Sequence, residues 1–120
     1  MMKPNEPPWE RKPSSIPAIE VRVWMKGTDY GGRNYPFSAR YCPHLVAKGK
    51  ETMWGIRVLA VTRSPHKEEV FPGDEAELVC ELMYYHKGFE YEDLKRGSTF
   101  EIREGSRVIG TGVVLSDFEW

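Results

Sequence analysis

Cys42 and His44 are the two residues of this 120-residue chain whose types and spacing come nearest to a metal site. Two positions apart on a strand, their side chains would point to the same face and could share one ion. A third ligand is not evident, because His66 and His86 stand far along the chain and form no His-x-x-x-His or Cys-x-x-Cys spacing. We therefore expect no bound metal.

No motif for nucleotide chemistry or covalent catalysis occurs in the sequence. A phosphate-binding loop needs Gly-x-x-x-x-Gly-Lys followed by Ser or Thr, so that backbone amides surround the phosphates, and no such run is present. The Gly-x-Ser-x-Gly turn of serine hydrolases is also missing. The acidic residues have the spacing of solvated strand faces rather than of an acid–base pair. We expect no enzymatic activity, no cofactor and no bound nucleotide.

The stretch 98–115 has the pattern of a β-hairpin. Apolar and charged residues alternate over 100–103, a period of two that buries one face and exposes the other. Gly105 allows the tight reversal at Glu104-Gly105-Ser106, because it tolerates a positive φ. Gly110 and Gly112 lie two apart on one face of the return strand, where another backbone can approach closely.

Four further strands are predicted upstream from the same alternation, over residues 18–26, 38–47, 52–62 and 75–84. Pro43 indicates an edge or a bulge in the second of these, because proline has no N–H to donate. In the third, Ile56, Val58 and Ala60 should share one face. Tyr91 and Leu94, in the last long loop, are expected to fold over one end of the sheet. No segment shows a sustained helical period, so the protein should be all-β, a sandwich or a closed barrel.

Composition favours a single soluble domain. The chain is 40% hydrophobic and 29% charged with a net charge of −1, which excludes a generally basic nucleic-acid binder. No apolar run is long enough for a membrane helix and the start does not resemble a signal peptide, so we expect no membrane contact and a cytoplasmic location. Residues 1–17 hold five of the nine prolines and should form a disordered tail before a domain at 18–116, and 117–120 a short second tail.

Three motifs occur in one order along the chain: Gly31-Gly32-Arg33-x-x-Pro36-Phe37 with Tyr41-x-Pro43, then Pro72-Gly73-Asp74, then Phe100-x-Ile102-Arg103-Glu104-Gly105-x-Arg107-x-x-Gly110-x-Gly112-Val113-Val114. Together they resemble the third, C-terminal domain of bacterial elongation factor Tu over roughly residues 19–115. The resemblance implies a closed six-stranded antiparallel Greek-key β-barrel. It also implies a stand-alone domain without the GTPase domain of that factor.

In the elongation factor, this domain touches the T-stem of aminoacyl-tRNA, mostly through phosphate and sugar contacts. The resemblance transfers such contacts to Arg33, Glu104 and Gly105, and an arginine–phosphate pair there is physically sensible. The other reading is that Arg33 pairs internally and Glu104-Gly105 serves only the turn. Further candidates for contacts to RNA or to a partner are Tyr41, His44, Arg103 and Arg107.

This chain differs from the family at positions on which the inferred RNA contacts depend. After Tyr41 the family usually has arginine, proline and glutamine, whereas Cys42, Pro43 and His44 stand here. One cationic contact and one base-reading amide are thereby lost or altered, so any tRNA binding should be weak and strongly salt-dependent.

The family's third domain also binds proteins, and exposed aromatic residues are typical anchors of such surfaces. Trp24, on the nominally outer face of the first strand, and Trp54 are candidates for partner contacts, and the alternative is that they cap the barrel ends. We favour a protein-interaction or regulatory module linked to the translation machinery, because the net charge is near zero and the tRNA-reading loop is altered. The alternative is a weak tRNA- or RNA-binding module.

Overall fold

The computed structural model describes residues 16–83 and 91–118, so most of the predicted tail at 1–17 and the last two residues lie outside it. Pro17, which we assigned to that tail, is fully buried, and its carbonyl oxygen accepts a hydrogen bond from the Leu82 amide. The packed domain therefore includes Pro17. Within the described ranges, no helix has the length and apolar character needed to cross a membrane.

Six strands and two short 3-10 helices form in the described residues. The strands are β1 (Ala18–Met25), β2 (His44–Ala47), β3 (Trp54–Arg63), β4 (Glu75–Leu82), β5 (Thr99–Glu104) and β6 (Arg107–Val114), and the helices are η1 (Thr28–Tyr30) and η2 (Glu92–Leu94). The predicted hairpin at 98–115 is β5 and β6, joined by a turn in which Gly105 has φ 62°.

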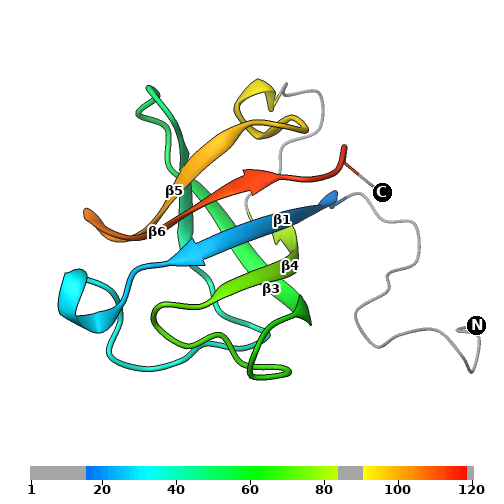
Figure 1. Cartoon of the computed structure of the whole chain (residues 1–120). Coiled ribbons are helices and arrows are strands. Elements are labelled where there is room, and N and C mark those ends of the chain that lie inside the picture. Colours follow the sequence, from blue (N-terminus) through cyan, green and yellow to red (C-terminus); the bar gives the residue numbers. More distant parts are fainter. Residues whose placement is uncertain (1–15, 84–90, 119–120) are drawn as a thin grey trace, which may run out of the picture.

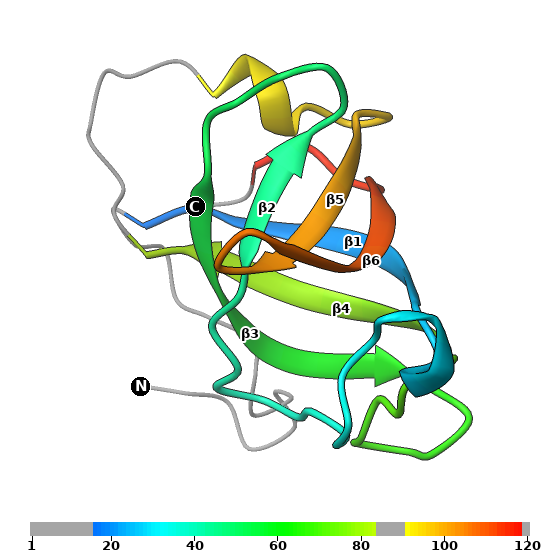
Figure 2. The same cartoon turned by 90° about the vertical axis from the view of Figure 1, so that its left-hand side faces the viewer.

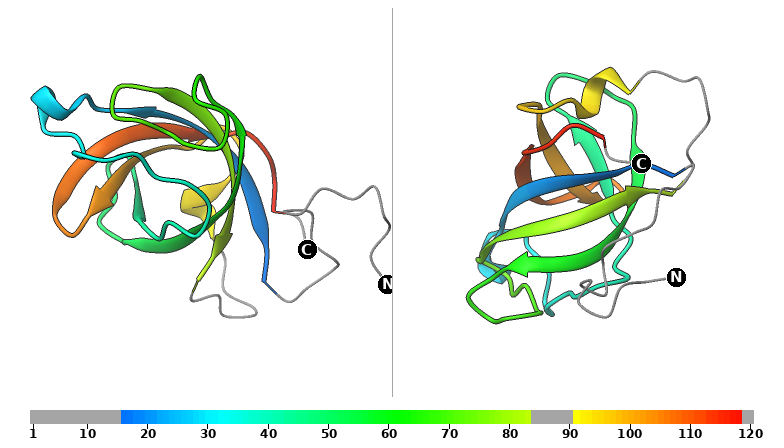
Figure 3. Two further views of the ribbon diagram at one scale, coloured as in Figure 1. Left: turned by 90° about the horizontal axis from the view of Figure 1, so that it is seen from below. Right: turned by 90° about the vertical axis from the view of Figure 1, so that its right-hand side faces the viewer.

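The strands close into one antiparallel ring in the order β1-β4-β3-β2-β5-β6, with β1 also paired to β6 (Figures 1 and 2). β2, β3 and β4 follow one another as neighbours, and β5 returns by a long connection to lie beside β2, which is the Greek-key arrangement. The view from below in Figure 3 shows the strands curving around a common interior. The predicted all-β, closed six-stranded antiparallel Greek-key barrel is confirmed.

The interior is filled by the apolar residues of the predicted alternation. In β1, Ile19, Val21 and Val23 are at most 2% exposed, and the residues between them face outward. Tyr91 and Leu94 join the same core, as predicted for the last long loop. The one-sided pattern of β1 thus leaves its outer face to the polar residues and Trp24.

β2 is shorter than the predicted strand at 38–47 and begins only at His44. Arg40 has a φ of 79°, which extended strands exclude, and Pro43 has no N–H for a ladder. The segment still lies along β3, since the Arg40 N–H donates to the Val58 carbonyl (2.7 Å) and the Val58 N–H to the Tyr41 carbonyl (2.8 Å). It follows β3 as an irregular chain rather than as a regular strand.

A register shift in β3 changes which residues face inward. The pairing with β4 slips between Val58 and Ala60, so that Ala60 pairs with Val79, and Val61 is the residue packed against the core. Ala60 and Val79 are both buried, but neither belongs to the core cluster. The prediction that Ala60 shares the face of Val58 is therefore wrong. One extra residue in a bulge reverses the alternation that follows it.

The two glycines of β6 are sites of close approach, as predicted. A Cβ atom on Gly112 would lie 2.4 Å from Phe100 Cζ and 2.6 Å from the Arg22 carbonyl oxygen. A Cβ atom on Gly110 would lie 2.9 Å from the Trp24 carbonyl oxygen. β6 can therefore cross closely over β1 and β5 only because these positions lack side chains.

Candidate functional site

The loop over 27–37 is fastened to the β5–β6 turn at one end of the barrel (Figure 1). Arg107 Nη2 donates to the Gly32 carbonyl oxygen at 2.8 Å, and the Gly32 N–H donates to the Gly27 carbonyl at 3.0 Å. A Cβ atom on Gly32 would lie 2.1 Å from the Lys26 carbonyl oxygen, so only glycine fits there. This fixed loop sets the position of the next residue, Arg33.

Arg33, Tyr41 and Glu104 meet at this end of the barrel, although they come from three separate parts of the chain. The Arg33 guanidinium forms an ion pair with Glu104 Oε2, and the Tyr41 hydroxyl donates to the same oxygen. Arg33 Cζ also lies 4.4 Å from the centre of the Tyr41 ring, which adds a cation–π contact. The Arg33 and Glu104 side chains are 20% and 34% exposed, so the pair is partly shielded from water.

Tyr41 is held in this arrangement by stacking on Phe37, with ring centroids 4.6 Å apart. Phe37 in turn exchanges two backbone hydrogen bonds with Val70. Burial raises the pKa of Tyr41 well above its usual value, and the hydrogen bond to Glu104 raises it further. The hydroxyl is therefore a permanent donor to the carboxylate at neutral pH.

The family model for the elongation factor Tu C-terminal domain matches residues 14–116 of the chain. The chain belongs to the elongation factor Tu C-terminal domain family. The resemblance inferred from the three motifs is thus confirmed, and the barrel is that of a translation-factor-related domain.

In this member of the family, four of the predicted site residues come together, namely Arg33, Tyr41, Glu104 and Arg107. They contact one another or the loop backbone: besides Glu104, Arg33 bonds through Nε to the Tyr35 carbonyl at 3.2 Å. The internal pairing that we considered for Arg33 is therefore the one found. Gly105 stands exposed beside the group, at the tip of the hairpin.

His44 and Arg103 form a second pair, as cross-strand neighbours on β2 and β5. Arg103 bonds to Glu101 Oε1 through two guanidinium nitrogens and is 30% exposed. Cys42 is exposed, and its thiol donates to the Arg40 carbonyl oxygen at 3.2 Å. Across 16–83 and 91–118, no three His, Cys, Asp or Glu side chains gather as a metal site would require.

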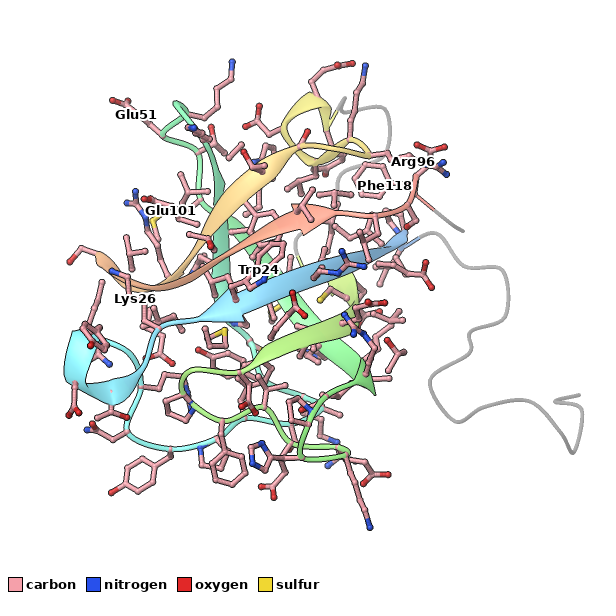
Figure 4. The ribbon with its side chains drawn as sticks, in the orientation of Figure 1. Trp24, Lys26, Glu51, Arg96, Glu101 and Phe118 are labelled. Atoms are coloured by element: carbon pink, nitrogen blue, oxygen red, sulfur yellow. The ribbon has the colours of Figure 1, made fainter. Side chains whose placement is uncertain are left out.

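The two tryptophans, Trp24 and Trp54, have different surroundings. Trp24 is 43% exposed on the outer face of β1, and its Nε1 donates to Glu75 Oε1 at 2.6 Å (Figure 4). Trp54 packs against the core, donates to Asp93 Oδ2 at 3.1 Å and meets the edge of Tyr91 at 5.0 Å. Trp54 thus covers a barrel end, while Trp24 lies open on the barrel wall.

Sequence reasoning missed two residues of the 27–37 loop. Tyr30 and Tyr35 are 83% and 73% exposed, on either side of Arg33 in the chain. Large aromatic rings within a glycine-rich turn, where no strand alternation assigns them to a core, were the signal that could have found them.

Proposed function

We propose that this domain is a non-catalytic protein-binding module of the translation machinery and that Trp24 anchors its partner. The observation that carries the proposal is the state of Trp24, which is half exposed on the barrel wall and already hydrogen-bonded to Glu75. Tryptophan is among the residues that most often dominate the energy of protein interfaces. A side chain fixed before binding also loses less conformational entropy when the complex forms.

The surroundings of Trp24 support a protein rather than a polyanion as partner. On the neighbouring β4, Glu75 lies 3.6 Å from Arg63 Nη2, and Glu77 pairs with both Arg63 (2.8 Å) and Arg22 (3.1 Å). Charges of both signs thus compensate one another beside the indole. A surface of balanced charge around an aromatic anchor is typical of protein interfaces, whereas nucleic-acid interfaces are strongly positive.

The test compares Trp24→Ala with Met53→Ala, because Trp24 and Met53 are exposed to nearly the same extent, 43% and 42%. Tagged protein is incubated with purified translation factors at physiological salt after nuclease treatment, and the affinity for the retained factor is measured. We expect Trp24→Ala to weaken binding at least about tenfold, which is about 1.4 kcal/mol, and Met53→Ala to leave it unchanged. Equal affinities of the two variants would refute the role of Trp24.

A weak tRNA- or RNA-binding function is the second candidate, and the exposed rings of Tyr30 and Tyr35 favour it. Aromatic side chains beside an arginine can stack on unpaired bases while the cation meets a phosphate. The pairing of Arg33 with Glu104 opposes this function, because the carboxylate already compensates the charge. If RNA is the ligand, Arg33→Ala should reduce the slope of log affinity against log salt by about one. Either function would operate in the cytoplasm, where translation takes place.

A further inference from the structure

A small hollow with mostly apolar walls lies at the end of the barrel where β4 finishes. Its volume is about 160 Å³, and it is lined by Thr52, Met53, Trp54, Gly55, Leu82 and Tyr91. Trp24 and the 27–37 loop lie at the other end of β4, since Trp24 pairs with Glu75, the first residue of that strand. Along the strand this is roughly 23 Å from Leu82. The hollow is therefore separate from the surface assigned to Trp24.

The walls of the hollow are fixed by contacts within the barrel. The Trp54 indole N–H donates to Asp93 Oδ2 at 3.1 Å, and the Trp54 ring meets the edge of Tyr91, with centroids 5.0 Å apart. Leu82 is buried, whereas Met53 is 42% exposed. A methionine side chain adapts its shape to a bound group, and its sulfur makes favourable contacts with aromatic rings. The hollow thus combines rigid aromatic walls with one adaptable side chain.

The size and the chemistry of the hollow suit one aromatic ring. An apolar protein cavity of roughly 150 Å³ takes up benzene, and this hollow has nearly the same volume. Aromatic rings prefer offset-stacked or edge-to-face neighbours, and Trp54 and Tyr91 both offer such contacts. A ring that entered the hollow would also cover the exposed side chain of Met53.

We propose that the ring of Trp9, from the segment before the described residues, docks in this hollow. Trp9 is the only aromatic residue in the sequence of residues 1–15. It also precedes the part of the chain that matches the family, which begins at residue 14, so the family's domain does not account for it. The docked ring would attach the predicted tail to the barrel at one point beyond Pro17.

The place where the chain enters the barrel favours the chain's own tryptophan as the occupant. Pro17 is buried, and its carbonyl oxygen accepts a hydrogen bond from the N–H of Leu82, which lines the hollow. Figure 2 shows the start of β1 and the end of β4 at the same side of the barrel. The eight residues from Trp9 to Pro17 can span at most about 27 Å. A tether this short gives an effective concentration in the millimolar range, so that even a weak contact is populated.

The two residues before Trp9 favour docking of this kind. Proline fixes φ at about −65° and has no N–H for a strand ladder, so the pair Pro7-Pro8 favours an extended polyproline II conformation. Such segments bind to grooves lined by aromatic side chains and lose little entropy, because their conformation is already formed. Trp54 and Tyr91 supply the aromatic side chains here.

The test follows the indole N–H signal of Trp9 by ¹⁵N NMR in the full chain. Trp9→Ala identifies this signal by its loss, and a synthetic peptide of residues 3–12 gives the position of the signal when the ring is free. Met53→Glu places a charge in the lining of the hollow and should release the ring. The matched control is Tyr35→Glu, which adds the same charge at another exposed large side chain, in the 27–37 loop.

In the wild type we expect the Trp9 signal to differ from its position in the peptide, and Trp9→Ala to shift the amide signals of Thr52, Gly55 and Leu82. Met53→Glu should move the Trp9 signal to the peptide position, and Tyr35→Glu should leave it unchanged. A wild-type signal at the peptide position, or the same response to both glutamate variants, would overturn the docking. A signal that moves toward the peptide position on about tenfold dilution would assign the occupant to a second copy of the chain and overturn the choice of the chain's own segment.

Discussion

Replacing Glu104 by glutamine removes one charge from a carboxylate that serves two partners. In the Glu104→Gln variant the side-chain amide would keep the shape and an acceptor for the Tyr41 hydroxyl, but the Arg33 guanidinium would lose its counter-charge. A hydrogen bond between charged groups stabilises a fold by about 1.5–3 kcal/mol when it is shielded. Because the two side chains are 20% and 34% exposed, water screens part of this, and we expect a loss of about 1–2 kcal/mol.

Urea denaturation followed by tryptophan fluorescence measures this change in the free energy of unfolding. The matched control is Glu101→Gln, which removes the same charge from the same strand. Glu101 is 40% exposed and pairs with Arg103 on the barrel wall, so its loss should cost less than about 0.5 kcal/mol. A Glu104→Gln variant within about 0.3 kcal/mol of the wild type, or no less stable than the control, would refute the reasoning.

The barrel core, the partly buried Tyr41 and the two cysteines allow three more tests. Burial and Glu104 raise the pKa of Tyr41 above its unfolded value of about 10, so the free energy of unfolding should hold below about pH 10 and fall as pH rises further. Urea titrations across that range should show a smaller fall in Tyr41→Phe, and an equal fall would contradict the linkage. Gly112→Ala should cost about 3 kcal/mol, because the new Cβ would overlap Phe100 and the Arg22 backbone. Thr111→Ala, measured in the same way, should cost less than about 1 kcal/mol, and similar losses in both would rule out the overlap. Burial raises the pKa of the Cys80 thiol to about 12, so iodoacetamide at about pH 8 should label exposed Cys42 alone. If mass spectrometry found both cysteines labelled in the native protein, the prediction would be wrong.

The number of strands and their positions along the chain could be predicted from the sequence, because alternation and turn residues are local properties. The closed barrel was implied by the family resemblance. The predictions failed where the backbone conformation of a segment depends on how it pairs with another strand. Ala60 was placed on the core face because a bulge leaves no mark in an apolar run such as 58–61. The irregular start of β2 depends on the positive φ of Arg40, and arginine is not a residue that predicts such a conformation.

For the candidate site, likewise, the sequence identified residues but not the contacts between them. The motifs identified Arg33 and Glu104 as important, and their pairing was one of two readings that the residue types allowed. The choice required the distance between a loop and a hairpin 71 positions further along the chain. Tyr41 could not be assigned to the same carboxylate from sequence, because its position depends on stacking against Phe37. The separate placement of Trp24 and Trp54 likewise depends on the closure of the barrel.

The pairing of β1 with β6 has a consequence for how the domain folds. The ring is sealed by contacts such as that between the Glu20 amide and the Ser116 hydroxyl, 96 positions apart in the chain. Until the last strand is available, one edge of β1 has no partner, and contacts of such high sequence separation carry a large loop-closure cost. Refolding should therefore be slow for a domain of this size and end with ring closure. The same closeness of first and last strands means that a circular permutant, joined there and opened at another turn, would keep every strand pair of the barrel.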